Sequence, residues 1–135
     1  MNYLIAISIA TLSWFVAAAI LFFNPIVDKI YQKEEGHPSV RVLPKSPATI
    51  AKILLAVVVQ CSLWALVYYW IQPSLPADKM HAGLIFAGII VLMKIIPRDI
   101  DRVLLTTYPS QRMTIEFIVG IICALVVGFV YAWWL

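Results

Sequence analysis

Charge is scarce in this sequence. Asp, Glu, Lys and Arg make up 13% of the 135 residues, whereas 63% are hydrophobic. A typical soluble domain has about 25% charged and about 45–50% apolar residues, and a chain this small cannot bury so large an apolar excess. The composition therefore excludes a soluble enzyme and a disordered chain, and it predicts an integral membrane protein. The formal net charge of +3 is also too small and too local for a nucleic-acid-binding surface.

Reactive side chains are few as well. The two cysteines, Cys61 and Cys123, form no CxxC pair and fall near the middle of apolar runs, which favours free thiols packed among apolar side chains. The two histidines, His37 and His81, fall on opposite sides of the predicted membrane and so cannot share a metal ion. No expected span has an interior histidine to hold a haem. We therefore expect no metal site, no cofactor and no catalytic residue.

Long apolar runs define the expected membrane spans. A helix needs about 20 mostly apolar residues to cross the hydrocarbon core. One run is interrupted by Lys94 and Pro97, and its uncharged part is too short to cross, so this span must include Lys94. The expected spans are about residues 3–23, 53–71, 82–103 and 115–135. The predicted fold class is therefore all-α, with residues 1–135 forming a single domain, a four-transmembrane-helix bundle.

Short amphipathic segments follow the first and third spans. Between residues 26 and 33, and again between residues 98 and 104, apolar side chains recur on one helical face and charged side chains on the other. This pattern is typical of a helix that lies in the head-group layer of a membrane. We expect an interfacial helix after each of these two spans.

Basic residues indicate the orientation of the chain, because Lys and Arg in short loops stay on the cytoplasmic side. Nine of the ten fall in or beside the first and third connections, and Lys79 alone falls in the middle one. Tyr and Trp side chains gather at the opposite ends of the spans, as amphipathic rings do at a membrane interface. The sequence therefore predicts a bacterial inner-membrane protein with both termini outside the cytoplasm.

A candidate polar cluster lies toward the cytoplasmic ends of the last two spans. Lys94 falls roughly 5 Å past the midplane at the helical rise per residue, and an unpaired charge there costs about 2.5–3.5 kcal/mol. Its long stem allows the ammonium to snorkel toward the head groups. Alternatively it pairs with Glu116, which has a similar depth, or binds an anionic substrate. Arg98, one turn further, competes for Glu116, and Arg112 completes the cluster.

Small residues recur at every fourth position of the last span, a pattern that lets another backbone approach closely. These residues are Gly120, Ala124, Gly128 and Ala132. The pattern leaves open whether the partner helix belongs to this chain or to a second copy. Gln60, near the middle of the second span, is expected to form a hydrogen bond to another helix, a contact worth about 0.6 kcal/mol on average.

Several short sequence features lie within the expected spans or at their ends. They are Asn2-Tyr3 before an uncharged first span, Trp14 within it, the exit at Asn24-Pro25, a glycine-containing third span that runs into Pro97, and a Trp-rich end. Together they resemble a bacterial and fungal family of small four-span membrane proteins of unknown function. The chain departs from that family at Thr106-Thr107-Tyr108 and at Glu116, where the family has an acidic-aromatic stretch and an Asp and a His. The resemblance implies four spans and no defined activity.

Two functional hypotheses follow. The first is a small non-enzymatic membrane protein, either a subunit of a larger membrane complex or a transporter-like homo-oligomer, because four short spans enclose little polar volume. The alternative is a membrane-embedded enzyme or binding protein that acts on a lipid or lipophilic anionic substrate at the cytoplasmic leaflet. The lipid bilayer is a partner in both cases, and a nucleic acid in neither.

The predicted orientation can be tested with a reporter that is active only in the cytoplasm. Fused after Leu135, the reporter should give no signal, because both termini are expected outside. A strong signal from this fusion would overturn the orientation.

Overall fold

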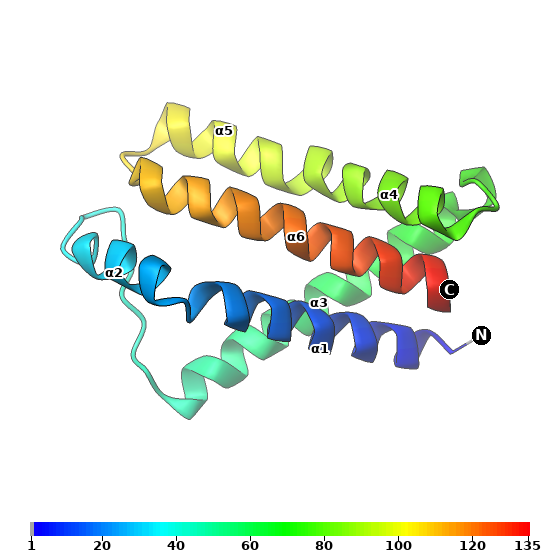
Figure 1. The fold of residues 1–135 in the computed structure, drawn as a ribbon, viewed down its shortest axis with the longest axis horizontal. Helices are drawn as coiled ribbons and strands as arrows, with labels where there is room; N and C mark the ends of the chain where they lie inside the picture. Colours follow the sequence, from blue (N-terminus) through cyan, green and yellow to red (C-terminus); the bar gives the residue numbers. More distant parts are fainter. Residues whose placement is uncertain (1) are drawn as a thin grey trace.

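The computed structural model describes residues 2–135, and within that range it contains helices and loops but no strand (Figure 1). The elements are α1 (Tyr3–Phe22), α2 (Pro25–Lys33), α3 (Pro47–Ile71), the short 3-10 helix η1 (Gln72–Ser74), α4 (Lys79–Ile90), the π-helical turn η2 (Val91–Ile95), α5 (Ile96–Leu105) and α6 (Ser110–Trp134). The predicted all-α bundle is confirmed.

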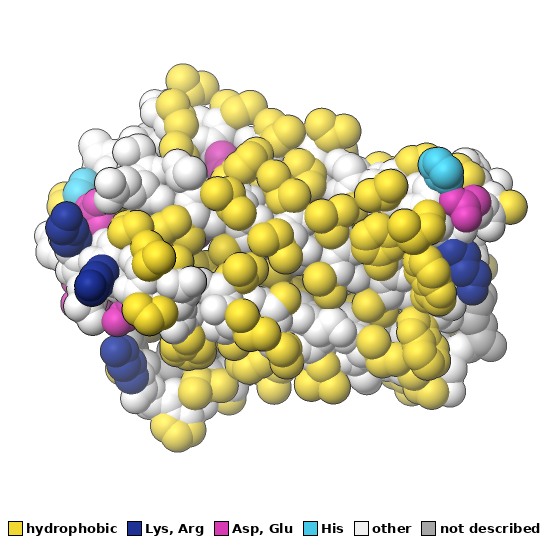
Figure 2. All heavy atoms as spheres, viewed as in Figure 1, with side chains coloured by type: hydrophobic (Ala, Val, Ile, Leu, Met, Phe, Trp, Pro, Cys, Tyr) yellow, Lys and Arg dark blue, Asp and Glu magenta, His cyan; other side chains and the backbone are white. Residues whose placement is uncertain are grey.

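Within residues 2–135, four helical runs are long and apolar enough to cross a membrane. They are Tyr3–Phe22, Pro47–Ser74, Lys79–Leu105 and Ser110–Trp134. Large apolar side chains cover the middle of the molecule, and the visible Lys and Arg side chains lie near its two ends (Figure 2). A water-soluble protein does not leave such a continuous apolar surface exposed. This chain is therefore a membrane protein, and both its termini lie at the same end of the bundle (Figure 1).

The second, third and fourth spans begin earlier than expected from hydropathy, at Pro47, Lys79 and Ser110, and capping residues explain this for the second and third. The Ser46 side chain accepts a hydrogen bond from the Thr49 N–H, and Pro47 occupies the first turn of α3. At the other end of the bundle, the Asp78 carboxylate caps α4 by accepting from the His81 N–H, which holds the pKa of Asp78 below its usual value. Polar caps of this kind extend each helix beyond its apolar stretch.

The third span continues through Pro97 without a break. Proline has no N–H to donate to the carbonyl of Met93 and its ring crowds that carbonyl. The wider turn of η2 precedes the proline, and the Ile96 N–H bonds five residues back to the Val91 carbonyl. As a result, α5 is a direct continuation of the span, whereas α2 is a separate helix capped by Asn24. The short helix expected after the first span is present as α2, whereas the short helix expected after the third span forms the last part of that span itself.

Three large aromatic side chains of the core lie near the end of the bundle that holds the termini. Tyr68, Phe86 and Tyr131 are buried there, and the rings of Tyr68 and Phe86 meet edge to face with centroids 4.9 Å apart. The Tyr131 hydroxyl donates to the Cys61 carbonyl at 2.5 Å, which ties α6 to α3. Toward the other end α3 leaves the bundle (Figure 1), and its first buried residue is Val57.

The small residues of α6 face a helix of the same chain. A Cβ added to Gly128 would lie 2.4 Å from the Gly83 carbonyl oxygen and 3.0 Å from the Ala87 Cβ, both on α4. A Cβ on Gly120 would meet the Ile95 side chain at 2.9 Å. This face therefore packs α6 against the α4–η2 run, so it does not call for a second copy of the chain.

The Gly128 contact can be tested with two alanine variants. Gly128→Ala forces backbones apart and should lower the free energy of unfolding by about 1–3 kcal/mol, as overpacking does. Gly88→Ala is the matched control, because a Cβ at Gly88 meets nothing within 4 Å, so its stability should be unchanged or slightly raised. Unfolding titrations in detergent measure both. Equal stabilities would show that the α4–α6 contact is not tight.

Candidate functional site

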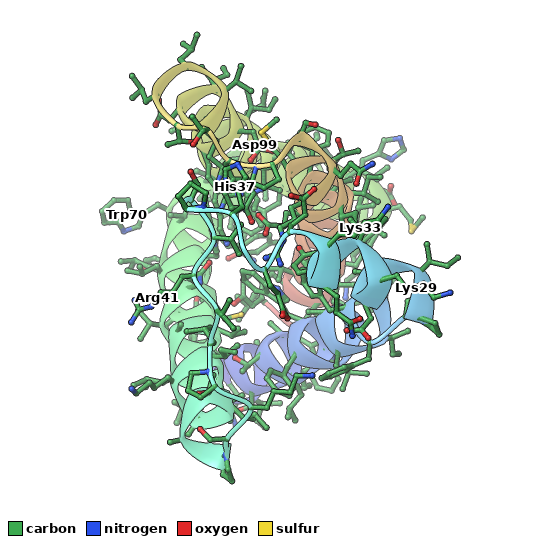
Figure 3. The ribbon with its side chains drawn as sticks, turned by 90° about the vertical axis from the view of Figure 1, so that its left-hand side faces the viewer. Lys29, Lys33, His37, Arg41, Trp70 and Asp99 are labelled. Carbon is green, nitrogen blue, oxygen red and sulfur yellow. The ribbon has the colours of Figure 1, made fainter. Side chains whose placement is uncertain are left out.

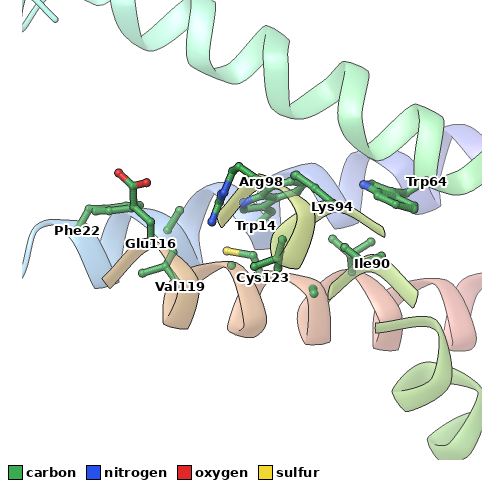
Figure 4. A pocket seen from close by; sticks show the side chains of 14 residues that line it. Trp14, Phe22, Trp64, Ile90, Lys94, Arg98, Glu116, Val119 and Cys123 are labelled. Atoms are coloured by element: carbon green, nitrogen blue, oxygen red, sulfur yellow. The ribbon is translucent and has the colours of Figure 1, made fainter. Parts of the chain in front are cut away.

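A cavity of about 220 Å³ lies between α1, α3, α6 and the α4–η2–α5 run (Figure 4). Its walls are largely apolar and include the rings of Trp14, Phe22 and Trp64. The charged side chains that line it are Lys94, Arg98 and Glu116. Charged groups in an apolar cavity at membrane depth mark a candidate functional site, because water is not there to solvate them.

Lys94 belongs to η2, and its ammonium contacts two other helices. It donates a hydrogen bond to Gln60 Oε1 on α3 and lies 4.2 Å from the centroid of the Trp14 ring on α1. An ammonium has three N–H donors, and among residues 2–135 Gln60 is its hydrogen-bond acceptor and no carboxylate lies within 4.0 Å. The Lys94–Glu116 ion pair, one of the alternatives that the sequence left open, is therefore not formed, and Gln60 bonds across helices as its position suggested.

Glu116 is instead surrounded by partners that the sequence reading missed. Arg102 forms an ion pair with it, and the Tyr108 hydroxyl donates to it. The Tyr31 hydroxyl on α2 donates to the same carboxylate at 3.2 Å. Burial and the negative charge of Glu116 raise the pKa of both Tyr31 and Tyr108, so both hydroxyls keep their protons and act as donors. The charge of Glu116 is thus neutralised without Lys94.

Arg112 has a structural role at the same end of the bundle. It is buried, with 7% of its surface exposed, and its guanidinium donates to the Tyr31 carbonyl at 2.6 Å. The guanidinium also lies over the Tyr31 ring, 4.1 Å from the centroid. Arg112 therefore fastens α2 onto α6 and is not among the residues that line the cavity.

The Arg98 guanidinium uses only part of its hydrogen-bonding capacity within residues 2–135. Its Nε donates to Asp99 Oδ1 at 2.9 Å, while its Nη2 is buried and has no hydrogen-bond partner among residues 2–135. In Figure 4, Arg98 and Lys94 lie side by side in the cavity. A buried donor without a partner costs about 1–3 kcal/mol, and more when it is charged. The Arg98 guanidinium therefore has a free donor in the wall of a cavity that Lys94 also lines.

The charges around this cavity do not balance. The charged side chains that line it are two cations, Lys94 and Arg98, and one carboxylate, Glu116. Two further charged groups pair with these residues, since Asp99 pairs with Arg98 and Arg102 pairs with Glu116. The lining therefore has an excess of one positive charge in a setting that favours neutrality. An anion bound beside Lys94 and Arg98 would reduce this excess.

The predicted four-residue polar cluster is thus divided in two. Lys94, Arg98 and Glu116 share the cavity, and Arg112 belongs to the contact between α2 and α6. Each partner of Glu116 lies outside α6, the helix that carries Glu116. Tyr31 is on α2, Arg102 is on α5 and Tyr108 is in the loop before α6. Helical spacing within one span could not identify them. No three His, Cys, Asp or Glu side chains in the described part of the chain are grouped as a metal site.

Comparisons with known protein families, with characterised proteins and with solved structures find no match to this chain. The resemblance to the small four-span family therefore stays a prediction. The fold and the site define a class of protein. This chain is a helical membrane protein whose bundle holds a largely apolar cavity with the charged side chains Lys94, Arg98 and Glu116 in its wall.

The Lys94 contact can be tested by a double-mutant cycle. Lys94→Met leaves the Gln60 amide without its donor, and Gln60→Leu leaves the ammonium without its acceptor, so the double variant should recover part of the loss. We expect a coupling of about 0.5–3 kcal/mol for this pair. The cycle of Lys94→Met with Glu116→Gln should show a smaller coupling, because these two side chains have separate partners. Unfolding titrations in detergent provide the free energies, and a larger coupling for the second pair would contradict the structure.

Proposed function

We propose that this chain is a non-enzymatic membrane protein that binds the anionic head group of an amphiphile in the cavity beside Lys94 and Arg98. One observation carries the proposal: the Lys94 ammonium lines an apolar cavity with no carboxylate within ion-pair distance among residues 2–135. A cation at membrane depth is stabilised by an anion. The unpartnered Arg98 Nη2 supplies a second donor for the same anion.

The size of the cavity favours a head group over a whole ligand. Sites for drug-sized molecules have volumes of about 300–1,000 Å³, and this cavity has about 220 Å³. A phosphate or carboxylate group is small enough to enter, and both accept hydrogen bonds from ammonium and guanidinium groups. The remaining apolar part of such a molecule has to lie elsewhere on the protein or in the lipid.

The predicted orientation assigns the ligand to the cytoplasmic leaflet. Figure 3 views the end of the bundle that holds Lys29, Lys33 and Arg41, on α2 and the loop after it. Glu116, at the edge of the cavity, is bonded to Tyr31 of the same α2. If basic connections lie in the cytoplasm, the cavity lies in the cytoplasmic half of the bilayer. Anionic lipids would reach it from there.

The proposal does not require an oligomer. A homo-oligomeric transporter was expected partly because four spans enclose little polar volume, yet the single chain encloses a charged cavity. The small-residue face of α6 is occupied by α4. Assembly into a larger complex remains compatible with the lipid-facing surfaces, but binding of an anion needs one chain only.

Thermal unfolding in a neutral detergent tests the proposal. Dioleoylphosphatidylglycerol should raise the midpoint of unfolding, because a ligand that binds the folded state alone stabilises it, whereas dioleoylphosphatidylcholine should not. Lys94→Met should abolish most of this shift. Lys33→Met is the matched control, since Lys33 is exposed at the same end of the bundle and should leave the shift intact. An equal loss in both variants would indicate general surface electrostatics and would overturn the proposed site.

A further inference from the structure

The cavity beside Lys94 and Arg98 adjoins an apolar groove between two helices. A groove of about 400 Å³ lies between α1 and the first half of α3. It is lined by Phe15 and Ala19 of α1, by Phe23 directly after α1, and by Ile50, Ile53 and Val57 of α3. The lining residues carry no charge, so the groove suits a hydrocarbon chain and not a head group.

The cavity and the groove share part of their walls. Trp14, Ala18 and Phe22 line both of them, and all three belong to successive turns of α1. The cavity and the groove therefore adjoin each other along the same length of α1. A molecule with a small anionic end and a long apolar end has a complementary surface for each end within one length of α1.

The divergence of α3 explains why the groove exists. Before Val57 no residue of α3 is buried, and Ile50 and Ile53 are 56% and 44% exposed. Apolar side chains exposed at this depth contact lipid chains, so the space between α1 and α3 opens sideways to the hydrocarbon layer. Figure 1 shows α3 leaving α1 toward the end of the bundle where α2 lies.

We propose that the opening between α1 and α3 admits the acyl chain of an anionic amphiphile, so that the head group binds Lys94 and Arg98 while the chain lies in the groove. The ligand class is a long-chain alkyl anion with a phosphate or carboxylate head. This inference rests on the proposed function, because the groove adds the chain requirement to the same anion site.

The chemistry of the two ends makes separate demands on the ligand. The head group neutralises part of the positive excess and accepts from the free donors of Lys94 and Arg98. The chain fills the groove and contacts Phe15, Phe23 and Ile53, which are among its lining residues. A long-chain anion should therefore bind more tightly than a short-chain anion with the same head.

Native mass spectrometry of the full chain can measure this with hexadecyl phosphate and butyl phosphate as probes. Ala19 lines the groove but not the cavity, so Ala19→Trp fills the groove and leaves the head-group site unchanged. We expect it to weaken hexadecyl phosphate binding by about tenfold or more, equivalent to about 1.4 kcal/mol, and to leave butyl phosphate binding unchanged. Ile20→Trp is the matched control, because Ile20 is 70% exposed on the same helix and lines neither space; it should not change either affinity.

The outcomes separate the two proposals. Unchanged hexadecyl phosphate binding in Ala19→Trp would overturn the groove while leaving the anion site in place, and Lys94→Met would then still abolish binding of both probes. Absence of binding by either probe to the unaltered protein would overturn the anion site, and the groove inference with it. Octadecanoate, tested in the same series, distinguishes a carboxylate from a phosphate head, and hexadecanol binding as tightly as hexadecyl phosphate would show that the groove acts without the cations.

Discussion

An ammonium group within hydrocarbon costs about 2.5–3.5 kcal/mol on insertion scales, and the arrangement around Lys94 meets that constraint with three separate helices. The π-turn η2 carries Lys94, the Gln60 amide of α3 accepts from it, and the Trp14 ring of α1 covers it. None of these contacts neutralises the charge. The cavity beside Lys94 is therefore the place where an anion would be stabilised, which links the packing of the bundle directly to a binding function.

The helices pack closely at the end of the bundle that holds the termini and diverge at the opposite end. The backbone contact of Gly128 with Gly83 holds α6 and α4 together, and Tyr131 ties α6 to α3 near the same end. Toward the opposite end α3 diverges and its side chains face lipid. The cavity and the apolar groove both lie in the region that this divergence opens. A closely packed end and an open end are thus produced by the same set of helices.

Glu116 closes the cavity on the side of α2. Its carboxylate is held by Arg102, Tyr108 and Tyr31, and Arg112 fixes the backbone of Tyr31. Because these partners saturate Glu116, its negative charge does not compete for Lys94 or Arg98. The network separates the negative charge from the free donors and keeps the cavity positive. This separation is the electrostatic condition on which the proposed binding of an anion depends.

Composition and local pattern determined the all-α class, the four long apolar helical runs and the amphipathic segments, because each of these depends on residues close together in the chain and on the thickness of a bilayer. The small residues of α6 were likewise visible as a packing face. Only the tertiary structure decided that Gly128 meets Gly83 of the same chain, that Lys94 bonds to Gln60 and not to Glu116, and that Tyr31 reaches Glu116 from α2. Those pairings depend on how helices cross and on the extra residue in η2, which shifts the side chains that follow it. A single sequence shows which side chains need a partner, whereas the angle between helices decides which partner is within reach.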